Sequence, residues 1–302
     1  ARNLHSAARR PKTVAIGPRD MSRIDLHLHT THSDGSQTPA EVVTLAHEAG
    51  VSALAITDHD ITTGLPEAMA TGQTLGIEII PGIEISSRHG ESELHVLGYF
   101  LKWEDAQLNE RLTALRESRH RRNPKIVALL QAAGIDITYD EVRAVAGSDS
   151  VGRPHIARVL MDKKVVTSAK EAFDRFLAEG KPAYVPRDLP SPADAIRWIR
   201  EAGGLAVLAH PTWVKTVEGT LTDLARQLKE QGLDGVEVHY STHTPRQTRE
   251  YLSLAKQLGL LVTGGSDFHG LTKPDIEVGT GKGSLHVPDH LLPKLKDAVA
   301  AL

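Results

Sequence analysis

Residues 24–35 read IDLHLHTTHSDG, a short apolar strand that ends in histidines and one carboxylate. Successive side chains of a strand point to opposite faces of its sheet, so His27 and His29 lie on one face, about 7 Å apart along the chain. Two imidazoles placed in this way can converge on one metal ion. Asp34 follows in the turn after the strand, close enough to join them. Taken alone, the stretch is also compatible with an ordinary core or surface histidine pair.

The chain then alternates short apolar strands with amphipathic helices, a rhythm that favours parallel strands. The first helix is expected over residues 39–49. Thr38 is a good helix cap, Pro39 suits the first turn, and Gly50 follows the end.

This rhythm stops between residues 104 and 182, where charged helices dominate and breaks are expected only at 134–138 and 147–152. We therefore expect a mainly helical insertion in a discontinuous barrel. Residues 1–20 are basic and are interpreted as a leader or cloning remnant, with a transit-like segment as the alternative. The expected domains are a barrel over 21–103 and 183–302 and an insertion domain over 104–182.

The composition excludes several classes of site. The chain has no cysteine, which excludes disulfides, thiolate metal sites and cysteine nucleophiles, and fits residence in the cytoplasm. The formal net charge of −3 argues against broad coating of nucleic acid, and no apolar run reaches the roughly 20 residues of a membrane span. With 16 histidines, a metal site here would use imidazole and carboxylate, which suit manganese, iron and zinc.

Later apolar strands also end in side chains that can bind a metal. In parallel α/β architectures the carboxyl ends of the strands form the active face, so these side chains should gather there. Asp58 is expected to orient a ligand or cap a helix rather than to bind directly. The strand-end residues are Asp58, His59, Glu84, His95, His210, Asp267 and His269.

Together these motifs resemble, in order, those of the PHP (polymerase and histidinol phosphatase) phosphoesterase family, over about residues 24–279. The resemblance implies an α/β fold, a distorted seven-stranded βα barrel of the TIM type with a metal cluster at its mouth. The matching segments are DLHLHTTHSDG, ITDHD, PGIEIS, HVLGY, LAHP and GSDFH.

The resemblance further implies two or three divalent ions, expected to be manganese, with iron, zinc or magnesium as alternatives. All nine implied ligand positions carry a competent side chain, which disfavours a degenerate copy. The implied ligands are His27, His29, Glu84 and Asp267 for one ion, Glu84, His95 and His210 for a second, and Asp34, His59 and His269 for a third.

Metal-activated hydroxide would attack phosphorus directly, since the sequence has neither a GxSxG elbow nor a GxxxxGK loop. Glu84 and Asp267 would act in catalysis as ligands. The leaving oxygen needs a proton or a metal, and His243, just beyond a strand end, is the candidate donor; a surface histidine is the alternative.

The segments VGRPHIARVL and FLAEGKPAYVP are similar to the insertion of the subgroup that acts on nucleoside 3′,5′-bisphosphates and on RNA ends. The implied reaction is removal of the 3′-phosphate, for example from adenosine 3′,5′-bisphosphate to give AMP. Arg153, Lys181 and Tyr184 are the candidates for binding the second phosphate.

Two other features have a plain structural interpretation by default. The basic helix that carries Arg119, Arg121 and Arg122 is expected to present a solvated face. Trp198 is expected in the core, whereas Trp213 would either stack on a base or cover the barrel mouth.

Other functions remain open at this point. A 5′-to-3′ exoribonuclease on short RNA would use the same metals, as would a histidinol-phosphate-type phosphatase. An amidohydrolase acting on C–N bonds and a structural metal-binding module are the alternatives of other classes. The expected partner is a small phosphorylated nucleotide, or short RNA, and no membrane or protein partner is inferred.

Overall fold

The computed structural model of the protein describes residues 23–302 apart from 91, 148–150, 215 and 217–218. The leader expected over residues 1–20 therefore lies outside the described residues. Within the described part of the chain, no helix is both long enough and apolar enough to cross a membrane.

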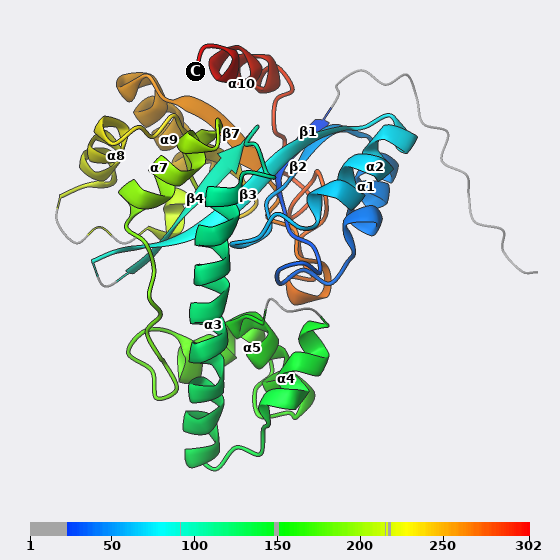
Figure 1. The fold of residues 1–302 in the computed structure, drawn as a ribbon, viewed down its shortest axis with the longest axis vertical. Helices are drawn as coiled ribbons and strands as arrows, with labels where there is room; N and C mark the ends of the chain where they lie inside the picture. Colours follow the sequence, from blue (N-terminus) through cyan, green and yellow to red (C-terminus); the bar gives the residue numbers. More distant parts are fainter. Residues whose placement is uncertain (1–22, 91, 148–150, 215, 217–218) are drawn as a thin grey trace, which may run out of the picture.

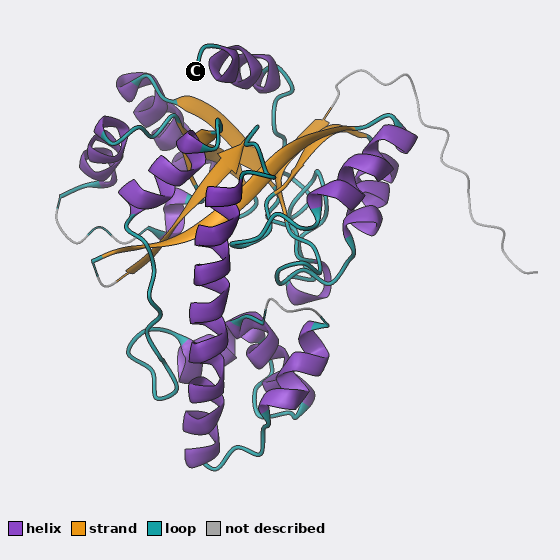
Figure 2. Cartoon of the chain, viewed as in Figure 1, coloured by secondary structure: helices purple, strands orange, loops and turns teal. Residues whose placement is uncertain are grey.

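A seven-stranded sheet, arranged in chain order from β1 to β7, runs through the described residues (Figure 2). Leu28, the last residue of the first strand, forms an isolated parallel bridge with Phe268, three residues beyond the last strand, so the sheet closes almost into a barrel. The predicted α/β fold with a distorted barrel is thus confirmed. The strands are β1 (Arg23–Leu28), β2 (Val51–Ile56), β3 (Glu78–His89), β4 (Ser92–Tyr99), β5 (Leu205–Leu208), β6 (Gly235–Tyr240) and β7 (Leu261–Gly265).

Strand β4 departs from the predicted parallel pairing. It pairs antiparallel with both β3 and β5, whereas the other neighbours in the sheet are parallel. Only two residues separate β3 from β4, and a parallel connection needs a crossover of about a dozen or more. The prediction was therefore wrong at this strand. Because β4 runs in reverse, its first half, which carries His95, lies beside the carboxyl end of β5.

Helices cover the outside of the sheet (Figure 1). Apolar residues of α1 and α2 pack on β2, and those of α7, α8 and α9 pack on β3 to β6. Helix α10 packs on the apolar residues at the opposite end of the barrel from His95. The helices are α1 (Pro39–Glu48), α2 (Leu65–Leu75), α3 (Ala106–Ala132), α4 (Tyr139–Ala146), α5 (Arg153–Asp162), α6 (Ala169–Ala172), α7 (Pro192–Glu201), α8 (Leu221–Glu230), α9 (Pro245–Leu258) and α10 (Leu291–Ala300).

The segment between β4 and β5 is mainly helical. Helix α3 runs from the barrel to a group formed by α4 and α5 (Figure 1). Around its far half, Ile126, Leu130, Val142 and Ile156 belong to an apolar cluster separate from those of the barrel. The helices also break at residues 163–168, beyond the two breaks expected. The domain boundaries themselves stay a prediction.

Closure of the barrel depends on a glycine. A Cβ atom built on Gly265, the last residue of β7, would lie 2.4 Å from both the Cβ and the backbone nitrogen of His27. No side chain fits in that space. The backbone of β7 can therefore approach β1 only because residue 265 has no side chain.

We predict that Gly265→Ala lowers the free energy of unfolding by about 1–3 kcal/mol, the usual cost of overpacking, as measured by urea denaturation. Gly50→Ala is the control. Gly50 has a φ of 74° and open space around it, so its variant tests backbone strain without a clash. A Gly265→Ala protein as stable as the wild type would show that β1 and β7 separate without cost.

Candidate metal centre

His27 in β1 and His29 directly after it point into the mouth of the barrel and are fully buried. The Nε2 atoms of His27 and His29 lie 3.1 Å apart. Closure of the barrel fixes them there: the backbone N–H of His29 donates to the carbonyl of Phe268, and that of Asp267 donates to the carbonyl of His27. The strand pair that closes the fold therefore also sets the position of both imidazoles.

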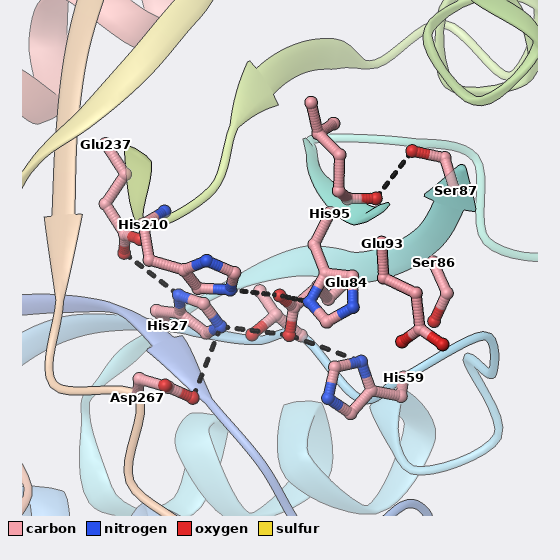
Figure 3. Close-up of polar contacts among 12 residues, drawn as sticks. His27, His59, Glu84, Ser86, Ser87, Glu93, His95, His210, Glu237 and Asp267 are labelled. Atoms are coloured by element: carbon pink, nitrogen blue, oxygen red, sulfur yellow. Dashed lines mark hydrogen bonds and ion pairs between the residues drawn. The ribbon is translucent and has the colours of Figure 1, made fainter. Parts of the chain in front are cut away.

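The carboxylate of Glu84, on β3, lies at the centre of the histidines (Figure 3). Its Oε2 atom is 3.1 Å from Nε2 of both His27 and His29 and 3.3 Å from Nδ1 of His59. Two ligand atoms bound at right angles to one ion at about 2.1 Å lie about 3 Å from each other. These separations therefore fit atoms that share an ion.

The second oxygen of Glu84 faces a different pair of histidines. Oε1 is 2.8 Å from Nδ1 of His95 and 2.9 Å from Nε2 of His210 (Figure 3). His95 comes from the reversed strand β4 and His210 follows β5. One carboxylate thus joins two sets of imidazoles, the arrangement expected of a ligand that bridges two ions.

A third group forms around Asp34, in the loop after β1. Its Oδ1 atom is 3.1 Å from Nε2 of His269, and its Oδ2 atom is 3.9 Å from Nε2 of His59. A tight turn returns the chain to this position, since the N–H of Gly35 donates to the carbonyl of Thr30. A Cβ on Gly35 would lie 2.6 Å from the backbone oxygen of His29, so the turn requires glycine.

Asp267, after β7, divides its two oxygens between different partners. Oδ2 accepts hydrogen bonds from the Tyr240 hydroxyl at 2.7 Å and from the Lys273 ammonium at 2.6 Å. Oδ1 faces Nε2 of His29 at 3.3 Å and Nε2 of His27 at 3.6 Å. One oxygen is therefore held in place while the other points at the histidines.

Two further buried carboxylates orient this set. Glu237 accepts from Nδ1 of His27 at 2.9 Å and from the backbone N–H of His210 at 2.7 Å. That bond leaves the Nε2 lone pair of His27 facing the centre of the site. Asp58 accepts from the backbone N–H and hydroxyl of Thr30, the residue after His29, and its role in orienting a ligand or capping a helix stays a prediction. Sequence reasoning missed Glu237, although a glutamate inside the apolar strand GVEVHY was a usable signal.

The carboxylates are anionic at neutral pH. Burial raises their pKa values, but the charges of His59 and His27 hold the pKa of Glu84 well below its usual range. In Asp267 the effect of burial is likewise outweighed, by Lys273 and His27, and the pKa falls. Anionic carboxylates among imidazoles are the donor set that a divalent ion requires.

The structure thus brings all nine predicted ligand residues together. Among the described residues, their donor atoms form overlapping groups with every atom within 4.8 Å of the others in its group, and His210 and Asp267 adjoin these groups through Glu84 and His29. That these residues bind metal stays a prediction. The groups are His29 with Asp34, His59 and His269; His27 with His29 and Glu84; and His59 with Glu84 and His95.

His243 is not brought into this site. Its Nδ1 atom lies 2.8 Å from the carbonyl of Val238, and its ring packs against Tyr240 and Tyr251. Among the described residues, those that line the two cavities at the metal centre do not include His243. A role as proton donor therefore has no support from the geometry.

The smaller of these cavities, of about 300 Å³, is lined by four arginines. Arg153 is one of them, as predicted for a substrate-binding residue, and it pairs with Glu93 at 2.8 Å. The other two predicted substrate-binding residues, Lys181 and Tyr184, are not among the described residues that line this cavity. Lys181 is exposed, and the Tyr184 hydroxyl accepts a hydrogen bond from Arg88 at 3.5 Å.

The other three arginines are Arg119, Arg122 and Arg187, each only 5–6% exposed. The expected solvated face is therefore wrong for Arg119 and Arg122, because α3 turns this side toward the barrel; only the side chain of Arg121 is well exposed, at 63%. Sequence reasoning missed Arg187, and no local pattern marks it.

One carboxylate connects the residues of this cavity to the metal centre. Asp60, directly after His59, accepts from Arg119 at 2.7 Å and Arg187 at 3.2 Å, and also from the backbone N–H of Ser86 at 2.8 Å. Its φ of 58° is a conformation that residues other than glycine rarely adopt. Asp60 thus joins α3, the segment before α7, and the loop that carries His59.

The positive charge in this cavity exceeds the negative charge. Among the described residues, Nε of Arg119 and both Nε and Nη1 of Arg187 are buried with no hydrogen-bond partner. Burial and the neighbouring arginines lower the pKa of Arg122 to about 8. Buried guanidinium nitrogens that lack a hydrogen-bond acceptor are unfavourable, and a bound anion such as phosphate would supply one.

The larger cavity, of about 700 Å³, lies on the other side of the same centre and is lined by apolar and aromatic residues together with carboxylates and lysines. The two cavities share His59, Glu93, His95, Phe173 and Lys273, so they meet over the metal centre.

Known proteins resemble the chain in sequence and in structure. A 3′,5′-nucleoside bisphosphate phosphatase of Chromobacterium violaceum is 35% identical over 260 residues, which cover 86% of this chain and 91% of that protein. A 5′-3′ exoribonuclease of Haemophilus influenzae is 34% identical over 247 residues, covering 82% and 90%. The crystal structure of a protein from Bifidobacterium adolescentis, described as a metal-dependent phosphoesterase, superposes with a TM-score of 0.82 at 30% identity, covering 91% of this chain and 95% of that one. The sequence model of the PHP domain matches residues 25–179. The chain therefore belongs to the PHP domain family.

Proposed function

We propose that the protein is a metal-dependent phosphoesterase that removes the 3′-phosphate from nucleoside 3′,5′-bisphosphates. The observation that carries the proposal is the cavity lined by four arginines, three of them buried, directly beside the cluster of histidines and carboxylates. A phosphomonoesterase for simple esters needs only the cluster. A second, unsatisfied cationic site indicates a substrate with a second phosphate.

The donor set fits divalent metal ions. It contains only imidazole nitrogens and carboxylate oxygens, and Nδ1 of His59 is buried without a hydrogen-bond partner among the described residues, 3.3 Å from Oε2 of Glu84. Nitrogen and oxygen ligands of this kind suit manganese, iron and zinc. We propose manganese in two or three sites, held by the nine residues. When bound, such ions lower the pKa of a water nucleophile and neutralise phosphoryl charge.

The protein's own side chains would place the substrate. Lys273 lies where the cavities meet, with its ammonium group against Asp267, and can contact an oxygen of the phosphate at the metal centre. Arg119, Arg122 and Arg187 would bind the second phosphate. The ribose of a bisphosphate joins both phosphates to the base, and the site offers three matching places: the metal centre, the arginine cavity and the larger cavity.

A second candidate is 5′-to-3′ exoribonuclease activity on short RNA. The larger cavity, of about 700 Å³, is lined in part by the exposed residues Lys170 and Lys282. Their ammonium groups could bind further phosphates of an RNA strand. The similarity to the Haemophilus exoribonuclease supports this candidate. In both reactions the 3′-phosphate that reacts would lie at the metal centre, and the arginine cavity would bind the 5′-phosphate of the same nucleotide.

We predict that Asp267→Asn lowers turnover by more than about 100-fold, because the metal centre loses an anionic ligand. Phosphate release, bound manganese by mass spectrometry and the circular dichroism spectrum would be measured together. Asp297→Asn is the control, since Asp297 is exposed on α10 at the far end of the barrel. Near-normal turnover and manganese content in the Asp267 variant would contradict the metal assignment.

We predict opposite effects of Arg122→Met on activity and on stability. Loss of one phosphate contact should lower the ratio of kcat/KM for adenosine 3′,5′-bisphosphate to that for p-nitrophenyl phosphate about tenfold or more. Loss of a buried charge surrounded by other arginines should raise Tm, measured by calorimetry without substrate. Arg121→Met, one residue away on the exposed face, should change neither. An unchanged substrate ratio for Arg122→Met would argue against an anion site.

The substrate itself is tested by phosphate release from adenosine 3′,5′-bisphosphate, histidinol phosphate and a short 5′-phosphorylated RNA, each with manganese-loaded protein. We expect the bisphosphate to react fastest and to give AMP, because it satisfies both the metal centre and the arginine cavity. Faster degradation of the RNA would favour the exoribonuclease. Preference for histidinol phosphate would contradict both the bisphosphate phosphatase and the exoribonuclease assignments.

A further inference from the structure

Trp213 stands out among the residues that line the larger cavity. The side chain is 61% exposed, although tryptophan is on average a highly buried residue. The other two tryptophans of the chain, Trp103 and Trp198, pack against the apolar core. Among the described residues, Trp213 belongs to none of the apolar core clusters, and its side chain instead forms a hydrogen bond with Tyr240, which lines the same cavity.

The indole lies on a short, well-fixed turn. Trp213 ends the 3₁₀ turn η2 (Pro211–Trp213), which follows His210 directly, and its backbone N–H donates to the carbonyl of His210 at 3.0 Å. The neighbouring Thr212 hydroxyl accepts from the Gln247 side chain at 2.7 Å. A flat aromatic surface is thus positioned from the same turn that starts at a predicted metal ligand.

The walls around Trp213 are suited to a flat aromatic ligand. Leu94, Phe173, Val214 and Ile276 line the same cavity, where they provide apolar surface beside the charged residues of the metal centre. The arginine cavity lies on the other side of the shared residues, so a phosphate bound there and an aromatic group bound beside Trp213 would flank the metal centre. In a nucleoside 3′,5′-bisphosphate, the base and the 5′-phosphate are attached to the ribose in the same way on either side of the reacting 3′-phosphate.

We propose that Trp213 is the stacking platform for the nucleobase of the substrate and that it determines preference for nucleotides over other phosphate esters. This inference rests on the proposed function. Stacking on an aromatic side chain uses the π-face that every base has. The platform should therefore favour nucleotides strongly while distinguishing little among the four bases.

The test compares adenosine 3′,5′-bisphosphate with 1-deoxyribose 3,5-bisphosphate, which lacks the base, on manganese-loaded protein. Trp213→Ala should lower the ratio of kcat/KM for the nucleotide to that for the base-free compound about tenfold or more, mainly through KM. Trp213→Phe keeps an aromatic face and should retain most of the preference. Leu271→Ala is the matched control, because Leu271 is 65% exposed and is not among the described residues that line the cavity. An unchanged ratio in Trp213→Ala would overturn the proposal.

A binding measurement separates this inference from the proposed reaction. AMP should quench the tryptophan fluorescence of the wild-type protein, and the quenching should disappear in Trp213→Phe, which retains Trp103 and Trp198. Quenching that persists in this variant would place the base elsewhere and overturn the proposal. If no bisphosphate is hydrolysed, the proposed function fails, but quenching by AMP that depends on Trp213 would still support the platform.

Discussion

The buried carboxylate of Glu84 is the constraint around which the site is organised. An anion removed from water is unfavourable unless charges or hydrogen bonds compensate it. Its two oxygens meet five imidazoles, contributed by β1, β4 and the loops after β1, β2 and β5. Those elements have to converge at one end of the barrel for Glu84 to be compensated. Both the fold and the site therefore require these elements to converge on Glu84. Divalent ions bound between the imidazoles and the carboxylate would further offset its buried negative charge.

Most of the metal centre was predictable because it follows a simple rule: potential ligands at the ends of apolar strands meet at one end of a barrel. The rule worked for His210 and Asp267 and also for His95, though for a different reason. His95 reaches the site because β4 runs in reverse. The apolar segments IEIIPGIEI and LHVLGYF are only eight residues apart in the sequence, too few for a helical crossover, and this spacing could have indicated the antiparallel pair.

The arginine cavity was not predictable in the same way. Arg119 and Arg122 lie on a basic helix whose sequence resembles an ordinary solvated face, and Arg187 lies in a segment without regular structure. Their burial depends on the angle at which α3 meets the barrel and on the segment that covers it. Such contacts join residues more than 50 positions apart, such as Asp60 with Arg119 and Arg187, and no local periodicity reports them.

The position of Asp60 limits how freely the helical segment can be exchanged between related proteins. Its buried carboxylate is compensated by guanidinium groups from α3 and from the segment before α7, while its neighbour His59 belongs to the cluster of ligands. A transplanted segment without matching arginines would leave that charge unpaired, at a cost of roughly 3–5 kcal/mol. Under the proposed function the same arginines bind substrate, so substrate range and barrel stability would be inherited together, and a new specificity would have to preserve the partners of Asp60.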